Sequence, residues 1–509
     1  MSAVQPPSAA AAPGGTARPD TAAPVRHTAV LAITCLALAT VVSAMSSLNV
    51  ALPSIARDTH AGQTQLSWII DAYSLVFAAL LLPAGALGDR FGRRRALLAG
   101  LTVFGAGSAV AMTTSSPTAL IAVRALLGVG AALVMPATLA TITSTFPRER
   151  RAGAVSVWAA VAGASAVVGV LVAGSLLQEW SWRSVFLLNV LLAAVAALGV
   201  LVRVPESAEP AQPPLDLVGA LLVVAGLGVL VYSIIEAPQH GWGSPTTLAG
   251  SGIGLLVLIG FVAWELRTNH PLLDPRLFRN RRFAAGSLSI ALQFFAFFGF
   301  IFVLMQYLQL VRGDSALRAA VSMLPMALTL VPGSRLSPRL TARLGARRPW
   351  VAGLVLAAVG LALFSRVDGA TPYWQLAAIL VVLGAGLGLA MPPATTAITD
   401  ALPDTQQAVA SAVNDLAREL GGALGIAVLG SLLTAGYRGH LALPGVPDQL
   451  ARAARSSLGA AVSVGGPVLD HARSAFVAGL QDALLGGSAV VLVAAVGVAV
   501  LLRRRGPER

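Results

Sequence analysis

"GVGAALVMPATLATITSTFP", residues 128–147, occurs a second time in the chain as "GAGLGLAMPPATTAITDALP", residues 384–403. The two copies share glycine at their first and third positions, a Met-Pro pair in the middle and a proline at the end. They lie 256 residues apart, counted from Gly128 to Gly384. A repeat over this distance predicts that the chain consists of two similar halves.

Further matches extend the repeat. At the same offset, "VAGSLL" (172–177) matches "VLGSLL" (428–433). "LGDRFGRRR" (87–95) resembles "LTARLGARR" (340–348) at an offset of 253 residues. Chance similarity between apolar segments is the alternative explanation, but the shared Met-Pro pair and the ungapped length argue against it.

The composition is that of a membrane protein. Of the 509 residues, 56% are hydrophobic and 11% charged, whereas soluble proteins have roughly 25% charged residues. Apolar runs of about 20 residues recur along the chain, and each can cross a bilayer as a helix. We expect fourteen such helices, at 28–51, 66–88, 96–113, 118–142, 154–177, 183–202, 216–236, 247–266, 284–308, 316–334, 349–366, 373–394, 407–435 and 475–502.

The repeat matches the fourth and fifth runs to the twelfth and thirteenth. We therefore predict an all-α membrane protein of 14 transmembrane helices, with two six-helix halves (helices 1–6 and 9–14) and two inserted helices (7–8). Two like-oriented halves are typical of transporters that bind substrate between them, near the bilayer midplane. The expected regions are a disordered cytoplasmic tail (1–27), the halves at 28–203 and 283–503, the insertion with its flanking loops (204–282), an outer loop (436–474) and a cytoplasmic tail (504–509).

Several functional classes are disfavoured by the residues that the chain lacks. All 35 basic residues are arginine, so there is no lysine for a P-loop or a Schiff base. The six histidines fall in predicted loops or the N-terminal tail, which argues against a metal or haem site in the bundle. We therefore expect no enzyme, no catalytic residue, no metal and no cofactor.

The net charge of +13 is explained by membrane topology rather than by nucleic acid. The arginines gather in alternate loops and at the C-terminal end, which predicts that these segments and both termini are cytoplasmic. We expect a multi-pass protein of the plasma membrane, surrounded by lipid, with 436–474 outside. The arginine clusters lie at 90–95, 148–151, 267–282, 335–348 and 503–505.

"GALGDRFGRRR" (85–95) resembles the loop signature G-x-L-x-D-R-x-G-R-R of the major facilitator superfamily. Its glycines permit close backbone approach, and Asp89 can pair with arginines and hold one conformation of a rocking bundle. The alternative is a basic patch that only sets topology, which explains neither Asp89 nor the glycines. The residues assigned to this conformational loop are Gly85, Asp89, Arg90, Gly92, Arg93 and Arg94.

"LIAVRALLGVGAA" (120–132) is similar to the helix 4 motif of the same superfamily, with Arg124 as its buried base. The motifs that resemble its fourteen-span drug:proton antiporter branch are "NVALP" (49–53), "WIIDAYSL" (68–75), "WSWRSVFLLNV" (180–190) and "NDLARELGGALG" (414–425). Three residues depart from the branch: Ala44 replaces an aspartate, Val170 a proline and Leu127 a glutamine. These departures leave the proton stoichiometry open.

Charged residues inside an apolar run are the candidate coupling residues, because a charge near the bilayer centre is costly without a function or a partner. Asp415 and Arg418 are spaced i,i+3 and can form an internal ion pair that only steadies the helix. That alternative leaves Glu419 unexplained. We expect Glu419 to carry the proton or cation, followed by Asp71, whose alternative role is a hydrated interfacial residue beside Trp68. Acids at both places are what the resemblance implies.

Phe294, Phe298 and Phe302 fall on one helical face, near Gln293 and Gln306. We hypothesise an apolar pocket for amphipathic compounds there. Packing or lipid-facing phenylalanines are the more common alternative.

These observations predict a monomeric secondary transporter that exports amphipathic cationic drugs or antibiotics in exchange for protons, by alternating access. One alternative is an uncoupled facilitator or importer on the same fold, consistent with Ala44 and Val170. A less favoured one is a membrane sensor or scaffold that transports nothing. The residues do not identify the substrate.

Overall fold

The structure is a computed structural model that describes residues 27–208, 215–402 and 407–502. The two predicted tails lie outside these ranges, apart from His27, which begins the first helix. Within the described residues, fourteen helical segments are long and apolar enough to cross a membrane. The predicted number of spans and the all-α class are therefore confirmed.

The first six spans are α1 (His27–Thr59), α2 (Gln63–Phe91), α3 (Arg93–Thr113), α4 (Pro117–Thr145), α5 (Arg148–Glu179) and α6 (Arg183–Arg203). The inserted helices are α7 (Leu217–His240) and α8 (Pro245–Glu265), followed by the short 3-10 helix η1 (Pro275–Arg279). The last six spans are α9 (Arg281–Gln306) with the π-helical η2 (Tyr307–Val311), α10 (Ala316–Ser322) with α11 (Leu324–Leu344), α12 (Arg347–Phe364), α13 (Tyr373–Thr399), α14 (Gln407–His440) and α17 (Gly466–Leu501).

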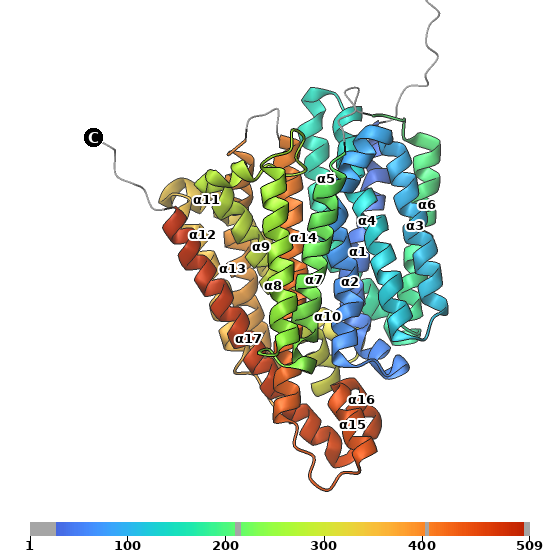
Figure 1. Ribbon diagram of the computed structural model, residues 1–509, viewed down its shortest axis with the longest axis vertical. Helices are drawn as coiled ribbons and strands as arrows, with labels where there is room; N and C mark the ends of the chain where they lie inside the picture. The colour runs from blue at the N-terminus through green and yellow to red at the C-terminus, as the bar shows by residue number, and fades with distance from the viewer. Residues whose placement is uncertain (1–26, 209–214, 403–406, 503–509) are drawn as a thin grey trace, which may run out of the picture.

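Corresponding helices pack in corresponding pairs. In the first half α1 packs on α5, α2 on α4, and α3 on both α4 and α6. In the second half α9 packs on α14, α11 on α13, and α12 on both α13 and α17. Figure 1 shows the two halves side by side, with α7 and α8 in front of the line where they meet. The predicted arrangement of two six-helix halves with two inserted helices is confirmed.

The repeated glycines explain why the pairs recur. A Cβ atom on Gly128 would lie 2.6 Å from the carbonyl oxygen of Tyr73, so α4 approaches α2 more closely than a larger residue allows. Gly384 makes the same close approach to the carbonyl oxygen of Met326 in α11. Tyr73 and Met326 differ by the 253 residues of the second echo, so the same contact is present in each half.

The tenth span is bent where a continuous run over 316–334 was expected. α10 ends at Ser322 and α11 begins at Leu324, one residue before Pro325. Proline has no N–H to donate and its ring clashes with the preceding turn, so a helix breaks there. Hydropathy does not register this interruption.

The stretch 436–474, expected as a loop, is largely helical. It contains the end of α14, the short helices α15 (Asp448–Ser456) and α16 (Leu458–Val464), and the start of α17. Helices this short fall below the length that a spanning run requires. The Oγ of Ser457 donates a hydrogen bond to the carbonyl of Ala61 at 3.2 Å, and α16 packs on both α1 and α17. The two short helices lie at the end of the bundle away from both chain termini (Figure 1).

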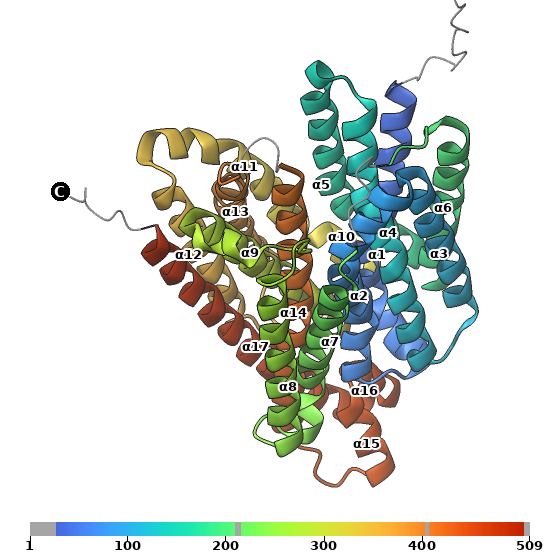
Figure 2. The ribbon, with the colours of Figure 1, turned by 45° about the horizontal axis from the view of Figure 1, so that its top comes forward.

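The halves touch near the end that carries α15 and α16. The amide of Gln309 donates to the carbonyl of Val50 at 2.9 Å, and Gly430 of α14 lies against Ser67 of α2. Toward the other end, where the termini lie, the ribbons of the two halves diverge (Figure 2).

Helix α7 covers the seam between the halves. Its Val231 and Ile235 belong to the same apolar cluster as Leu75 of α2 and Ala427 of α14. Polar contacts fix it to both halves, including a hydrogen bond of 3.2 Å from Arg438 Nη1 of α14 to the carbonyl of Pro238. Trp68 Nε1 donates to Glu236 at 3.1 Å, and Ser431 Oγ donates to the carbonyl of Ile234 at 2.5 Å.

Candidate functional site

The buried charged residues singled out in the sequence lie on α2, α4 and α14, which flank the seam. Asp71 and Arg124 are fully buried, and Glu419 and Asp415 are 6% and 9% exposed. The structure places the Arg124 guanidinium over the ring of Tyr73, pairs Asp415 with Arg418, and leaves Asp71 apart.

Arg124 is held by α2 without a carboxylate partner. Its Nε donates to the carbonyl of Ile69 at 2.9 Å, and its guanidinium carbon lies 4.2 Å from the centre of the Tyr73 ring. The Tyr73 hydroxyl donates to the carbonyl of Val41 at 3.1 Å, which fixes the ring. Within the described residues neither Nη atom of Arg124 has a hydrogen-bond partner. Two strong donors are therefore free at this point of the bundle.

Glu419 lies on the opposite side of the seam, in α14. Helix α14 packs against α2, the helix that carries Tyr73. The Oε2 atom of Glu419 has no hydrogen-bond partner among the described residues. Tyr73 thus stacks on the buried base of the first half, in the helix that packs against the one carrying the buried acid of the second. Tyr73 was not among the candidate residues of the sequence analysis. It follows Asp71 by two residues in "WIIDAYSL", and this spacing puts it on the opposite face of α2.

The internal ion pair expected between Asp415 and Arg418 is present. Arg418 Nη1 lies 3.7 Å from Asp415 Oδ1, which is longer than a direct charge-assisted hydrogen bond. The Arg418 guanidinium also lies over the ring of Phe294 in α9, 4.6 Å from its centre. An aromatic face attracts a cation, so Arg418 has two partners, Asp415 and Phe294, and among the described residues no salt bridge within 4 Å joins it to Glu419.

Asp71 is enclosed by protein rather than placed at a hydrated interface. Neither of its carboxylate oxygens has a hydrogen-bond partner among the described residues. It shares a helical face with Trp68 and Leu75, which contact α7. Asp71 therefore faces the α7 side of the seam, and the alternative of a hydrated interfacial residue does not describe its surroundings.

The five residues of the hypothesised apolar pocket are buried in α9, against α14. Phe298 lies against Gly422, and Phe302 lies against Gly430. Gln293 donates to Ser289 Oγ at 3.0 Å, and Gln306 donates to the carbonyl of Phe302 at 3.2 Å. The phenylalanine contacts are packing between two helices, and the glutamine bonds lie within α9. Phe294, through Arg418, is the member that touches the charged site.

The predicted conformational loop connects α2 with α3. Asp89 and Arg93 form a salt bridge of 2.9 Å across the turn, which therefore lies within the first half rather than between the halves. Gly92 adopts φ +114° between the two helices, a conformation that glycine alone takes readily. Gly85 lies against Pro136 of α4, where α2 and α4 pack.

The same loop is closed by the segment after α6, which sequence reasoning missed. Oε1 of Glu206 accepts a hydrogen bond from the backbone N–H of Arg94 at 3.1 Å, and Oε2 lies 3.7 Å from Nε of Arg95. The N–H of Arg93 donates to the carbonyl of Ser207 at 2.8 Å. The sequence did contain a signal for this contact, because Glu206 is an acid that follows an apolar run and Arg203.

Residues 34–426 match the sequence profile of the Major Facilitator Superfamily. The chain is 37% identical over 465 residues to the methyl viologen resistance protein SmvA of Salmonella typhimurium, covering 89% of this chain and 93% of that protein. It is 34% identical over 495 residues to the multidrug efflux pump LfrA of Mycolicibacterium smegmatis, covering 95% and 98%. It is 32% identical over 498 residues to the tetracenomycin C resistance and export protein of Streptomyces glaucescens, covering 93% and 91%.

Solved structures share the fold. A bacterial homologue of the human lysosomal transporter Spinster, in an inward-facing and occupied conformation, superimposes with a TM-score of 0.67 at 17% identity. The match covers 95% of this chain and 99% of that one.

Proposed function

The chain belongs to the Major Facilitator Superfamily, and we propose that it exports amphipathic cationic drugs or antibiotics in exchange for protons. The relatives named for drug resistance and export are similar over nearly their whole length, which supports export of compounds of this kind. Their names do not identify the substrate of this chain.

The observation that carries the proposal is the buried, incompletely paired carboxyl group of Glu419 beside the seam. A carboxyl group favours its neutral form when it is desolvated and its ionised form when water or a cation reaches it. Rocking of the halves changes its surroundings, so it takes up a proton on one side and releases it on the other. A cationic substrate that binds the ionised form competes with the proton, and this competition is antiport.

The neighbouring groups have distinct roles in this proposal. Arg124, stacked on Tyr73, places a buried positive charge in the first half, opposite the acid of the second. Phe294 holds the guanidinium of the neighbouring Arg418 over its ring. Asp71 is the second candidate for proton transfer, shielded by α7.

The test is transport of ethidium, a cationic dye, by purified protein in liposomes with an imposed pH gradient. We expect the wild-type protein to accumulate ethidium against its gradient, and Glu419→Gln to lose this accumulation while retaining its folded yield. Glu179→Gln, which removes an exposed carboxylate at the end of α5, serves as the control.

Two outcomes would contradict parts of the proposal. Wild-type ethidium fluxes that equilibrate without regard to the pH gradient would show an uncoupled facilitator. Gradient-driven accumulation by Glu419→Gln equal to the wild type would make Glu419 structural, and Asp71→Asn would then be the next variant.

We further propose that both termini are cytoplasmic, as the arginine distribution indicates. A cysteine at Gly445, an exposed position in 436–474, should react with a membrane-impermeant maleimide in intact cells. The native Cys35 is buried and is replaced by serine in this experiment. Labelling only after permeabilisation would reverse the orientation.

A further inference from the structure

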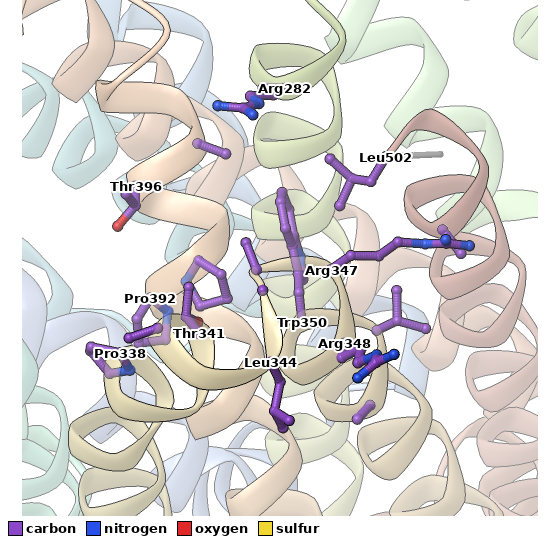
Figure 3. A pocket seen from close by; sticks show the side chains of 18 of the residues that line it. Arg282, Pro338, Thr341, Leu344, Arg347, Arg348, Trp350, Pro392, Thr396 and Leu502 are labelled. Carbon is purple, nitrogen blue, oxygen red and sulfur yellow. The ribbon is translucent and has the colours of Figure 1, made fainter. Parts of the chain in front are cut away.

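A cavity of about 1710 Å³ opens in the second half, outside the buried charged site. It lies between α9, α11, α12 and α13, beside the end of α17 at Leu502 (Figure 3). The lining of the cavity contains one acid, Asp400, and five arginines. The arginines that line it are Arg281, Arg282, Arg343, Arg347 and Arg348, all exposed.

The corresponding place in the first half holds its own anions. Arg94 and Arg95 are the repeat counterparts of Arg347 and Arg348, and they meet Glu206 in the segment after α6. The counterpart of Asp89 in the second half is Ala342, so the local acid is missing there. Among the described residues, none of the five cavity arginines forms an ion pair.

The repeated glycines show the same difference. Gly345 at the end of α11 has φ +77°, so the turn is kept in the second half. A Cβ atom on Gly92 would meet the Glu206 carboxylate at 2.5 Å, whereas one on Gly345 would meet nothing within 4 Å. Among the described residues, the second half therefore keeps the turn and the bases, but no carboxylate covers the turn as Glu206 does in the first half.

The cavity also has an apolar wall. Val351 and Val355 of α12 and Leu501 and Leu502 at the end of α17 line it. Figure 3 shows Arg347 reaching from α12 toward α17, beside Trp350 and Leu502. Bases next to an apolar wall at the end of a membrane helix suit a ligand with an anionic head and an apolar tail.

We propose that this cavity binds an anionic phospholipid of the cytoplasmic leaflet, with its anionic head group at the lining arginines and an acyl chain along α12 and α17. The inference rests on the cytoplasmic assignment of this end and not on drug export. Charge disfavours residues 503–509 as the occupant, because they contain four arginines and one glutamate. The apolar wall favours a lipid over free phosphate.

The experiment is native mass spectrometry of the delipidated full chain with dioleoyl-phosphatidylglycerol or dioleoyl-phosphatidylcholine at equal concentration. We expect retention of phosphatidylglycerol in preference to phosphatidylcholine. The triple variant Arg282→Gln, Arg347→Gln, Arg348→Gln should weaken retention of phosphatidylglycerol roughly tenfold or more, since each arginine near a membrane surface contributes substantially to anionic lipid binding. The same three positions changed to lysine should restore most of it.

The matched control removes three exposed arginines that do not line the cavity, by Arg267→Gln, Arg335→Gln and Arg339→Gln. Equal loss of binding in the control and the cavity variant would overturn the proposal, because the whole basic end would then be responsible. Displacement of phosphatidylglycerol by an equal concentration of inorganic phosphate would also overturn it, in favour of a soluble anion. Val355→Gln should weaken retention of the lipid without changing binding of inorganic phosphate.

Discussion

The two halves have the same helix packing and different charges. Gly128 and Gly384 make equivalent close contacts, yet the buried Arg124 of α4 corresponds to Leu380 of α13. Likewise Glu419 of α14 corresponds to Gly163 of α5. Small residues therefore maintain the repeated scaffold, while the charged groups proposed for proton coupling occur in one half only.

The largest effect is expected when the residues at one repeat position are exchanged between the halves. Leu380→Arg should abolish folded protein, because it adds a buried charge without the carbonyl and ring that hold Arg124, at a cost of about 3–5 kcal/mol. Arg124→Leu should fold but lose transport, since the buried positive charge of the first half is removed. Folded yield by fluorescence-detected size exclusion and ethidium transport distinguish the two. A well-folded Leu380→Arg protein would show that the two positions are interchangeable.

The shared scaffold is tested at the paired glycines. Gly128→Ala and Gly384→Ala should each lower the free energy of unfolding by about 1–3 kcal/mol, because the added methyl group meets a backbone carbonyl. Gly163→Ala, whose Cβ meets nothing within 4 Å, is the control. Apparent Tm in detergent measures the effect. A loss at one of the paired glycines alone would mean that only one half depends on this contact.

A change in the loop after α2 is expected to affect transport more than stability. Asp89→Asn should leave the apparent Tm nearly unchanged, since a partly exposed salt bridge contributes about 0–1 kcal/mol. Ethidium transport at matched expression should nevertheless fall several-fold, because the turn between α2 and α3 is no longer fixed. Unchanged transport would reduce the loop to a topology signal. Glu179→Gln is again the control.

The smallest difference is expected between the two turn glycines. Gly345→Ala should cost about 1 kcal/mol, from its positive φ alone. Gly92→Ala should cost more, because the new methyl group also displaces Glu206. Adding Glu206→Ala to Gly92→Ala should recover that excess in apparent Tm. Equal losses at the two glycines would show that Glu206 does not press on the turn.

The features that could be predicted from the sequence depend on local residue patterns or on the internal repeat. Hydropathy gives the fourteen spans, and the repeat gives the pairing of the halves, because both depend on residue type and spacing. The ion pair of Asp415 and Arg418 was also accessible, since helical spacing places the two on one face.

The features missed depend on which helices become neighbours. Tyr73 and Arg124 are 51 residues apart, and no local pattern indicates that one stacks on the other. Periodicity places Phe298 and Phe302 on one face of α9, but it does not say that the glycines of α14 face them. Glu206 was missed for the same reason, because its partners lie more than a hundred residues earlier.

The number of inserted helices is even, and this determines the orientation of the second half in the membrane. A pair of spans returns the chain to the side from which it left, so α7 and α8 separate the halves without turning the second one over. A deletion of both helices that kept an adequate linker would preserve the orientation of α9 to α17. Loss of either helix alone would invert that half and place its arginine-rich loops across the membrane, against the positive-inside rule. Insertions between the halves are therefore confined to even numbers of spans.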